Sequence, residues 1–160
     1  MKKNINSIIE KRRRELGLRD IYVAEKIGLN IDSYCDIEWH EDEISEFPHL
    51  KEVKKLFLLL QLDFFEMVDL ICPFCSKQKK YDLEYNFPRN ELINKRRKDL
   101  NMTTAEFADK VGYYEIAILE MEEDPDFLEE WPISEILLLS DIISTPPQIL
   151  FAVKCKNCGR

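Results

Sequence analysis

The chain has 160 residues, of which 45% are hydrophobic, and this is enough apolar material for one ordinary domain or two small ones. A mainly disordered state is therefore excluded. Lys and Arg number 23 against 31 Asp and Glu, which gives a formal net charge of -8 at pH 7. This charge repels a nucleic-acid phosphate backbone at long range and favours a neutral or basic partner.

The composition also favours helices. The chain has only four Gly and seven Pro, and Leu, Ile, Glu and Lys are abundant. The longest aliphatic and aromatic run, residues 56–60, is far shorter than the roughly twenty residues that a membrane-spanning helix requires. The start of the chain contains no apolar signal core. We therefore expect a cytoplasmic protein without a membrane span, whose thiols stay reduced.

The sequence contains an internal repeat. Residues 11–16 (KRRREL) recur as KRRKDL at 95–100, and residues 24–28 (AEKIG) recur as ADKVG at 108–112. Position 12 thus matches position 96, and position 28 matches position 112, so the offset is 84 in both cases. Two copies of one unit are therefore predicted. The predicted division is a first copy at residues 1–75, a linker at 76–88 and a second copy at 89–160.

Within each copy the apolar residues recur at intervals of three and four, which is typical of amphipathic helices. We predict five short helices per copy. They cover residues 5–16, 20–27, 30–39, 48–60 and 64–71 in the first copy, and 90–100, 104–111, 114–121, 132–142 and 146–153 in the second. Gly28 and Gly112 are expected to end the second helix of each copy, because glycine adopts the left-handed conformation readily.

Capping signals support these helix starts. Thr103 followed by Glu106 predicts a capping box, and Asp63 followed by Glu66 has the same form. Proline is favoured at the first position of a helix, where its missing amide hydrogen is not needed. The prolines expected at such positions are Pro48, Pro132 and Pro146.

The order of these features resembles the Cro and phage-repressor (XRE) helix-turn-helix family. Residues 18–28 (LRDIYVAEKIG) and 102–112 (MTTAEFADKVG) each place a small Ala and a turn Gly at that family's spacing. The resemblance covers nearly the whole chain, twice. It implies an all-α fold of two five-helix helix-turn-helix repeats packed about a pseudo-twofold axis. The structural salt bridges that it implies, between helix one and the end of helix three, are Arg13–Glu38 and Arg97–Glu122.

In that family the start of helix three enters the major groove of DNA, and the start of helix two contacts phosphate. The matching residues here are Ile31, Asp32, Asp36 and Asp20 in the first copy, and Glu115, Ile116, Glu120 and Thr104 in the second. Arg, Lys, Asn and Gln normally read base edges, and none occurs at these positions. Residues 31–50 and 114–135 are rich in Asp and Glu and contain no Lys or Arg. The resemblance thus implies a retained fold with an inverted surface charge.

Aromatic and aliphatic residues lie among these acids, and such a mixture suits a basic protein partner. The acids are also compatible with a solvated face that contacts nothing. We interpret the surface as a site for a basic partner such as a nuclease toxin, because carboxylates mimic phosphate, and the protein as an immunity protein or antitoxin. The predicted partner-binding residues are Ile31, Asp32, Asp36, Trp39, Glu41, Asp42, Tyr114, Glu115, Ile116, Glu120, Glu123 and Asp124.

The alternative hypothesis is an XRE-family DNA-binding transcriptional regulator. Its DNA contacts would come from the basic residues of helix one, for which solvated or structural roles are the other interpretation. These residues are Arg12, Arg14, Arg96 and Lys98. An enzyme is not expected, because His40 and His49 have no Cys or Ser at a catalytic spacing and four glycines supply no phosphate cradle. No small-molecule substrate is predicted.

Two C-x-x-C motifs, Cys72–Cys75 and Cys155–Cys158, each follow the last helix of a copy. Position 72 matches 155 and position 75 matches 158, an offset of 83 in both cases. Each turn can place two thiolates on one side of a zinc ion, and two turns complete a tetrahedral shell. We predict one structural zinc shared by the copies. Disulfides, thioredoxin-type redox chemistry and free or separately metallated thiols are the alternatives. Cys35 is predicted to be a small buried hydrophobe.

Overall fold

The computed structural model describes residues 4–72, 75 and 88–159. Within these residues the protein is all-α, with eleven α-helices, one 3-10 helix and no strand. The predicted linker at 76–88 lies outside the described residues except for Pro88. None of the helices in the described part is both long enough and apolar enough to span a membrane.

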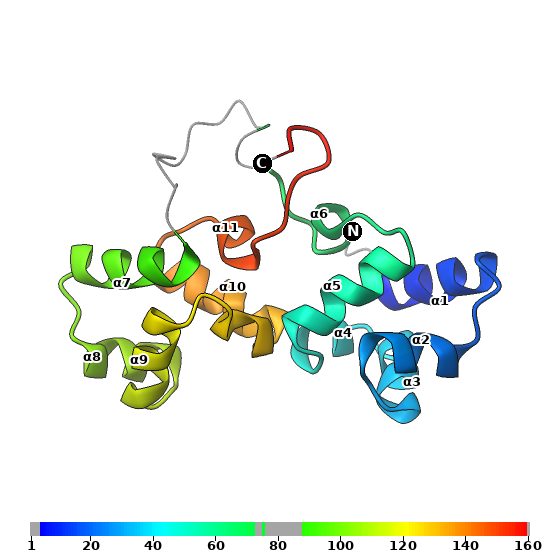
Figure 1. Ribbon diagram of the computed structural model, residues 1–160, viewed down its shortest axis with the longest axis horizontal. Coiled ribbons are helices and arrows are strands. Elements are labelled where there is room, and N and C mark those ends of the chain that lie inside the picture. Colours follow the sequence, from blue (N-terminus) through cyan, green and yellow to red (C-terminus); the bar gives the residue numbers. More distant parts are fainter. Residues whose placement is uncertain (1–3, 73–74, 76–87, 160) are drawn as a thin grey trace.

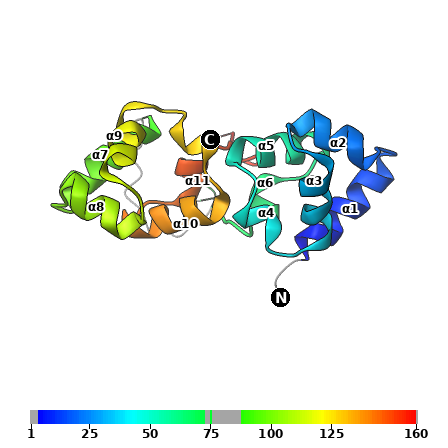
Figure 2. The ribbon, with the colours of Figure 1, turned by 90° about the horizontal axis from the view of Figure 1, so that it is seen from below.

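The helices form two groups. The first group holds α1 (Ile5–Glu15), α2 (Asp20–Ile27), α3 (Ile31–Trp39), α4 (Glu43–Glu46), α5 (Leu50–Leu59) and α6 (Phe64–Met67). The second group holds α7 (Arg89–Asp99), α8 (Thr104–Val111), α9 (Glu115–Glu123), the 3-10 helix η1 (Phe127–Glu130), α10 (Ile133–Ile142) and α11 (Pro147–Phe151). Figure 1 shows the groups side by side, with α5 and α10 at the centre. Figure 2 shows the same arrangement from below.

Local signals fix several helix ends as predicted. Gly28 and Gly112 close α2 and α8 in the left-handed conformation, with φ of 93° and 81°. Thr103 begins α8 with the predicted capping box: its side chain accepts a hydrogen bond from the Glu106 amide, and its own amide donates to the Glu106 carboxylate at 2.8 Å. The two side chains thus accept hydrogen bonds from backbone amides at the start of α8, which have no carbonyl partner within the helix.

Two predicted helices end early, and two short helices were not predicted. The helix expected at 64–71 stops at Met67, and Asp69 then turns the chain with a left-handed φ of 52°. The helix expected at 146–153 stops at Phe151, because Ala152 adopts a left-handed φ of 50°. The additional elements are α4 and η1. Each is a single turn, which is too short to show a helical period.

The prolines expected at first helical positions lie one or two residues before them. Pro48 lies two residues before α5, where the N-cap is His49. Pro132 and Pro146 are the N-caps of α10 and α11, and it is Pro147 that occupies the first position of α11. Proline therefore precedes these helices because its fixed φ suits an extended N-cap as well as a first turn.

One hydrophobic cluster connects both groups of helices. Its largest fully buried members include Tyr34 and Phe107. The ring of Phe64 lies 5.6 Å from that of Phe57 in its own group and, across the junction, 5.3 Å from that of Phe151. These aromatic contacts place α6 against α11, so the segments that follow these two helices start close together.

The backbone also joins the two groups, at the start of α5. The amide of Leu50 donates to the carbonyl oxygen of Trp131 at 2.8 Å. His49 and Pro132 form an isolated antiparallel bridge at the same place. This contact aligns α5 with the segment between η1 and α10.

Ion pairs continue this junction. Lys51 lies 2.5 Å from Glu130, and Lys54 lies 2.5 Å from Glu129, so α5 is tied to η1 by two pairs. Glu129 also accepts a hydrogen bond from Arg89 at 2.9 Å. Burial lowers the pKa of Lys54, and Glu129 partly opposes this effect. None of these junction residues carries a sequence signal that distinguishes it from a surface charge.

Candidate functional site

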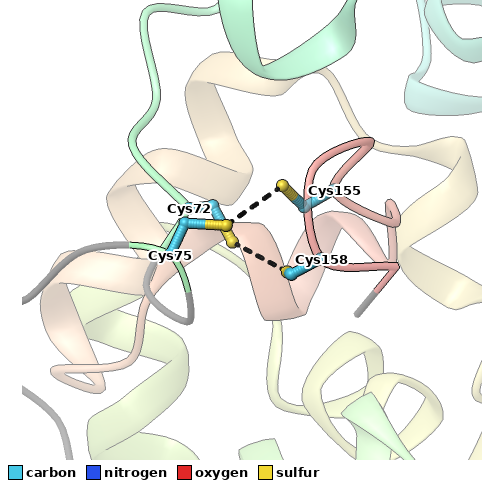
Figure 3. Close-up of side chains that lie close together, drawn as sticks. All are labelled: Cys72, Cys75, Cys155 and Cys158. Carbon is cyan, nitrogen blue, oxygen red and sulfur yellow. Dashed lines mark hydrogen bonds between the residues drawn. The ribbon is translucent and has the colours of Figure 1, made fainter.

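The two C-x-x-C motifs come together in the structure. The four sulfur atoms all lie within 4.8 Å of one another. The sulfur of Cys72 lies 3.7 Å from that of Cys158, and the sulfur of Cys75 lies 3.7 Å from that of Cys155 (Figure 3). A disulfide needs a sulfur separation of about 2.05 Å, so neither contact is a disulfide. The four cysteines form a candidate metal site, which we call the cysteine cluster.

The spacing of the sulfurs fits a zinc ion. Four thiolates at about 2.3 Å from zinc, in a tetrahedron, stand about 3.8 Å from one another. The two observed contacts of 3.7 Å are close to this value. Each motif forms a tight turn: the amide of Cys75 donates to the carbonyl of Cys72, and the amide of Gly159 donates to that of Cys155. The donor set and its geometry therefore suit a closed structural site.

Burial and thiol pKa differ among the four cysteines. Cys72 and Cys155 are buried, whereas Cys75 and Cys158 are exposed. Backbone amides, led by that of Asn157 at 3.4 Å from the sulfur, lower the pKa of the Cys155 thiol to about 7. Hydrogen bonds to the neighbouring sulfurs, led by that of Cys158, raise the pKa of Cys75 to about 12. The sulfurs are thus close enough to interact strongly.

Contacts outside the cluster hold its two segments together. The side-chain amide of Gln148 in α11 donates to the carbonyl oxygen of Ile71 at 2.8 Å. Lys156 forms an ion pair of 3.3 Å with Asp63. Cys35 lies on α3, outside the cluster, and is half-buried rather than fully buried as predicted. Burial raises the pKa of the Cys35 thiol, so it stays neutral.

Both salt bridges implied by the resemblance are present as bidentate pairs. Arg97 donates to Glu122 through Nε at 2.5 Å and Nη2 at 2.9 Å, and its third nitrogen donates to the carbonyl of Met102 at 2.9 Å. Arg13 contacts Glu38 in the same way. These pairs fix the end of the third helix of each group to the first helix.

The structure exposes most of the predicted partner-binding residues. Among the apolar ones, Trp39 is 68% exposed, Tyr114 83% and Ile116 67%. Ile31 and Asp36 are half-buried, and the remaining acids are exposed. Those acids are Asp32, Glu41, Asp42, Glu115, Glu120, Glu123 and Asp124. Large apolar side chains thus lie in an acidic surface on and beside α3 and α9.

Two tyrosines near these acids pack inward instead, one fully buried and one half-buried. Tyr34 is fully buried, and its hydroxyl donates to Glu38 at 2.5 Å. Tyr113 stacks on Trp131 with ring centroids 4.4 Å apart. Its hydroxyl donates to the carboxylate of Glu135, and burial raises the pKa of the Tyr113 hydroxyl. These rings contribute to packing.

Helix-one basic residues also have structural contacts. Arg12 donates to the carbonyl of Leu60 at 3.0 Å, and Arg96 donates to the carbonyl of Ser144 at 2.8 Å. Arg12 thereby satisfies a carbonyl oxygen at the end of α5, and Arg96 satisfies one just beyond the end of α10. Arg14 forms an ion pair with Glu10, on its own helix, and Lys98 is exposed. Arg12 and Arg96 are therefore not simply solvated cations.

Arg89 is a buried charge that the sequence analysis did not single out. It is 8% exposed. Its guanidinium donates to the carbonyl oxygens of Pro125 and Leu150 and to the carboxylate of Glu129. It also lies 3.4 Å from Asp126. An arginine next to a proline at a helix start has no pattern that would reveal this role.

Comparisons of the chain with protein-family models, with curated proteins and with solved structures found no match. Function is therefore argued from the cysteine cluster, the acidic surface and the contacts of individual residues.

Proposed function

We propose that this chain is a zinc-stapled, acidic protein of the helix-turn-helix fold that binds and neutralises a basic protein partner. The partner class that fits best is a nuclease-type toxin, which makes the chain an immunity protein or antitoxin of the cytoplasm. The observation that carries the proposal is the acidic surface of α3 and α9, in which large apolar side chains are exposed. These are the helices that would face DNA in the resembled family.

The helix bounds support two repeats of one unit. The bounds of α7, α8 and α9 follow those of α1, α2 and α3 at the constant offset of 84 found in the sequence, and η1 follows α4 in the same way. The bounds of α10 follow those of α5 at the cysteine offset of 83. The bridge between His49 and Pro132 joins two positions related by this second offset. A contact between equivalent positions is expected where a twofold axis passes between two copies.

The cysteine contacts support the same pseudo-twofold axis. At the cysteine offset, Cys72 corresponds to Cys155 and Cys75 corresponds to Cys158. If the two copies are exchanged, the contact between Cys72 and Cys158 therefore becomes the contact between Cys155 and Cys75. Both contacts measure 3.7 Å. The four thiolates would hold one zinc ion and leave it no open position, so the ion supplies a cross-link between the repeats. We assign it a structural role.

The acidic surface supports a basic protein rather than DNA as the partner. α3 and α9 lie on the same side of the molecule, away from the C-terminal segment of the cysteine cluster (Figure 1). One partner can therefore contact both helices. Exposed carboxylates would speed its encounter through long-range attraction, and Trp39, Tyr114 and Ile116 would supply buried contact area after docking.

The test is inhibition of a nuclease encoded next to this chain's gene. Purified nuclease is assayed with increasing amounts of this protein, and its activity should fall to a minimum near a fixed stoichiometry. A matched variant with neutral residues at the acidic positions should inhibit more weakly and lose less inhibition when salt is added. A neighbouring gene for a metabolic enzyme, with an operator upstream, would instead indicate a regulator.

An XRE-type DNA-binding regulator is the second candidate, because α3 and α9 share one side, as a pair of recognition helices would. Its cationic contacts would depend on exposed residues such as Arg14 and Lys98. A mobility shift with duplex DNA near physiological salt separates the two candidates. Tight, sequence-selective binding would favour the regulator.

A further inference from the structure

A cavity of about 200 Å³ lies at the junction between the two groups of helices. Its lining comes from α1, α4, α5 and α6 of the first group and from α10 of the second. The walls are mainly apolar and include Ile5, Phe57 and Leu137, while three acids also line it, namely Glu41, Asp42 and Asp69. No Lys, Arg or His is among the described residues of this lining. Within the described residues, the lining therefore combines an apolar wall with three acids and no cation.

The corresponding place in the second repeat is filled by Arg89. The offset that relates α1 to α7 carries Ile5, the first residue of α1, onto Arg89, the first residue of α7. The Arg89 guanidinium donates to the carbonyl of Leu150 at 3.2 Å and to that of Pro125, and it lies 3.4 Å from Asp126. The second repeat thus contains a bound guanidinium where the first repeat contains a cavity.

The residues around Arg89 have counterparts around the cavity. At the offset of 84, Pro125 and Asp126 correspond to Glu41 and Asp42. At the cysteine offset of 83, Leu150 corresponds to Met67. Glu41, Asp42 and Met67 all line the cavity. The cavity differs from the Arg89 site in its carboxylates. It has Ser45 where the Arg89 site has Glu129, so it lacks that carboxylate. It gains two others, because Glu41 and Asp69 stand where the second copy has Pro125 and Ala152.

We propose that this cavity receives an arginine side chain of the basic partner, an inference that rests on the function proposed above. The apolar wall would pack against the aliphatic stem, and Asp42 would accept hydrogen bonds from the guanidinium. Arginine fits better than lysine because the equivalent set around Arg89 combines carbonyl and carboxylate acceptors around a planar fork. A cavity of about 150 Å³ already admits a ligand the size of benzene, so the volume here is sufficient.

The test uses N-acetyl-arginine amide, which carries only the side-chain charge, and N-acetyl-lysine amide as its control. Each is titrated into the full chain while methyl resonances of the cavity residues are followed by NMR. We expect the arginine compound to shift the methyls of Ile5, Ile133 and Leu137, and the lysine compound to bind more weakly. Absence of cavity shifts, or equal shifts with both compounds, would overturn the assignment.

Two variants sharpen the experiment. Ile5→Arg should fill the cavity with its own guanidinium, as Arg89 does, and should weaken the arginine compound by about tenfold or more; Ile5→Leu keeps the volume and should bind normally. Asp42→Asn alters an exposed side chain and should weaken binding by about tenfold without unfolding the chain. Unchanged binding in both Ile5→Arg and Asp42→Asn contradicts the proposal.

The assay with the amide requires no partner protein, so it separates this inference from the proposed function. Arginine binding at the cavity together with no nuclease inhibition would retain the site and reject the proposed partner class. Nuclease inhibition that is equally strong in the Ile5→Arg variant would retain the function and reject the cavity as a contact.

Discussion

The guanidinium of Arg13 binds the carboxylate of Glu38 through two parallel hydrogen bonds, Nε to Oε1 at 2.6 Å and Nη2 to Oε2 at 2.7 Å. The two side chains are only 13% and 6% exposed. The hydroxyl of Tyr34 donates to the same carboxylate at 2.5 Å. The hydrogen bonds to Glu38 raise the pKa of Arg13, so its guanidinium stays charged. A buried carboxylate of this kind depends on its partner.

Arg13→Ala and Arg97→Ala should each destabilise the fold by on the order of 1 to 3 kcal/mol, because each leaves a buried glutamate without its cation. The loss should be larger for Arg97→Ala. Glu38 keeps the Tyr34 hydroxyl, whereas Ile118 stands at the equivalent position near Glu122 and has no hydroxyl to donate.

Urea unfolding monitored by circular dichroism measures both effects. Arg14→Ala is the matched control, since Arg14 is exposed and its ion pair is with Glu10 on its own helix. Unchanged unfolding midpoints in both the Arg13 and Arg97 variants would show that the pairs do not secure the third helices.

Removal of metal should destabilise the protein, because a zinc ion bound only to the folded state adds its binding free energy to folding. We expect about one zinc per chain by metal analysis. At a free zinc concentration about 100 times Kd the gain is about 2.7 kcal/mol, and Tm should rise by about 2–4 °C for each kcal/mol.

Cys158→Ser tests the same site without disturbing the interior, since Cys158 is exposed. It should lower both metal content and Tm, whereas Cys35→Ser, outside the cluster, should retain the metal. Equal Tm values for the unmodified protein with and without a chelator would rule out a zinc staple.

The capping box of α8 should make stability depend on pH. The amide and hydroxyl of Thr103 donate to Glu106 and lower the pKa of this carboxyl below its ordinary 4.5. A depressed carboxyl pKa contributes stability that is present above the ordinary value and is lost as pH falls through the folded-state pKa.

Glu106→Gln should therefore lower Tm at pH 7 but have a smaller effect well below pH 4.5, where the native carboxyl is protonated too. Asp109→Asn, on an exposed residue of the same helix, serves as the control. The same loss of Tm at both pH values would indicate that Glu106 stabilises α8 without its charge.

Local sequence signals predicted much of the helical framework. Glycines at the ends of α2 and α8 and the Thr103 capping box act within a few residues, so the printed sequence already contains their causes. The convergence of the four cysteines followed from two motifs at one repeat offset. The exposure of Asp32, Glu115 and Glu120 agrees with the acidic surface that the sequence predicted on these helices.

The junction could not be predicted in this way. Arg89 and Leu150 are far apart in the sequence, as are Lys54 and Glu129, so only tertiary packing brings them together. A sequence shows such residues as ordinary charges at helix starts or on helix faces. The cavity beside Ile5 is likewise a product of tertiary packing, because its lining comes from α1, α4, α5, α6 and α10.

Reversing the acidic surface should separate the two candidate functions by the sign of one effect. The changes are Asp32→Lys, Asp36→Lys, Glu115→Lys and Glu120→Lys, made together. If these acids face a basic protein, the variant should bind it more weakly and associate more slowly, and added salt should slow the association less than it does for the unmodified protein. A regulator would behave oppositely, because each carboxylate removed from a DNA-facing surface removes a repulsion with phosphate.

Two measurements are made side by side at roughly physiological ionic strength: a mobility shift with mixed duplex DNA, and association kinetics with the nuclease of the neighbouring gene. Glu25→Lys and Asp109→Lys, made together, change two exposed acids of α2 and α8 and show the effect of half that change in net charge at another surface. We expect the unmodified protein to leave DNA unshifted and the reversed variant to lose nuclease binding more than the control does. Sequence-selective DNA binding by the unmodified protein would overturn the assignment of α3 and α9 to a protein partner, since a surface of exposed carboxylates repels the phosphates that flank the groove.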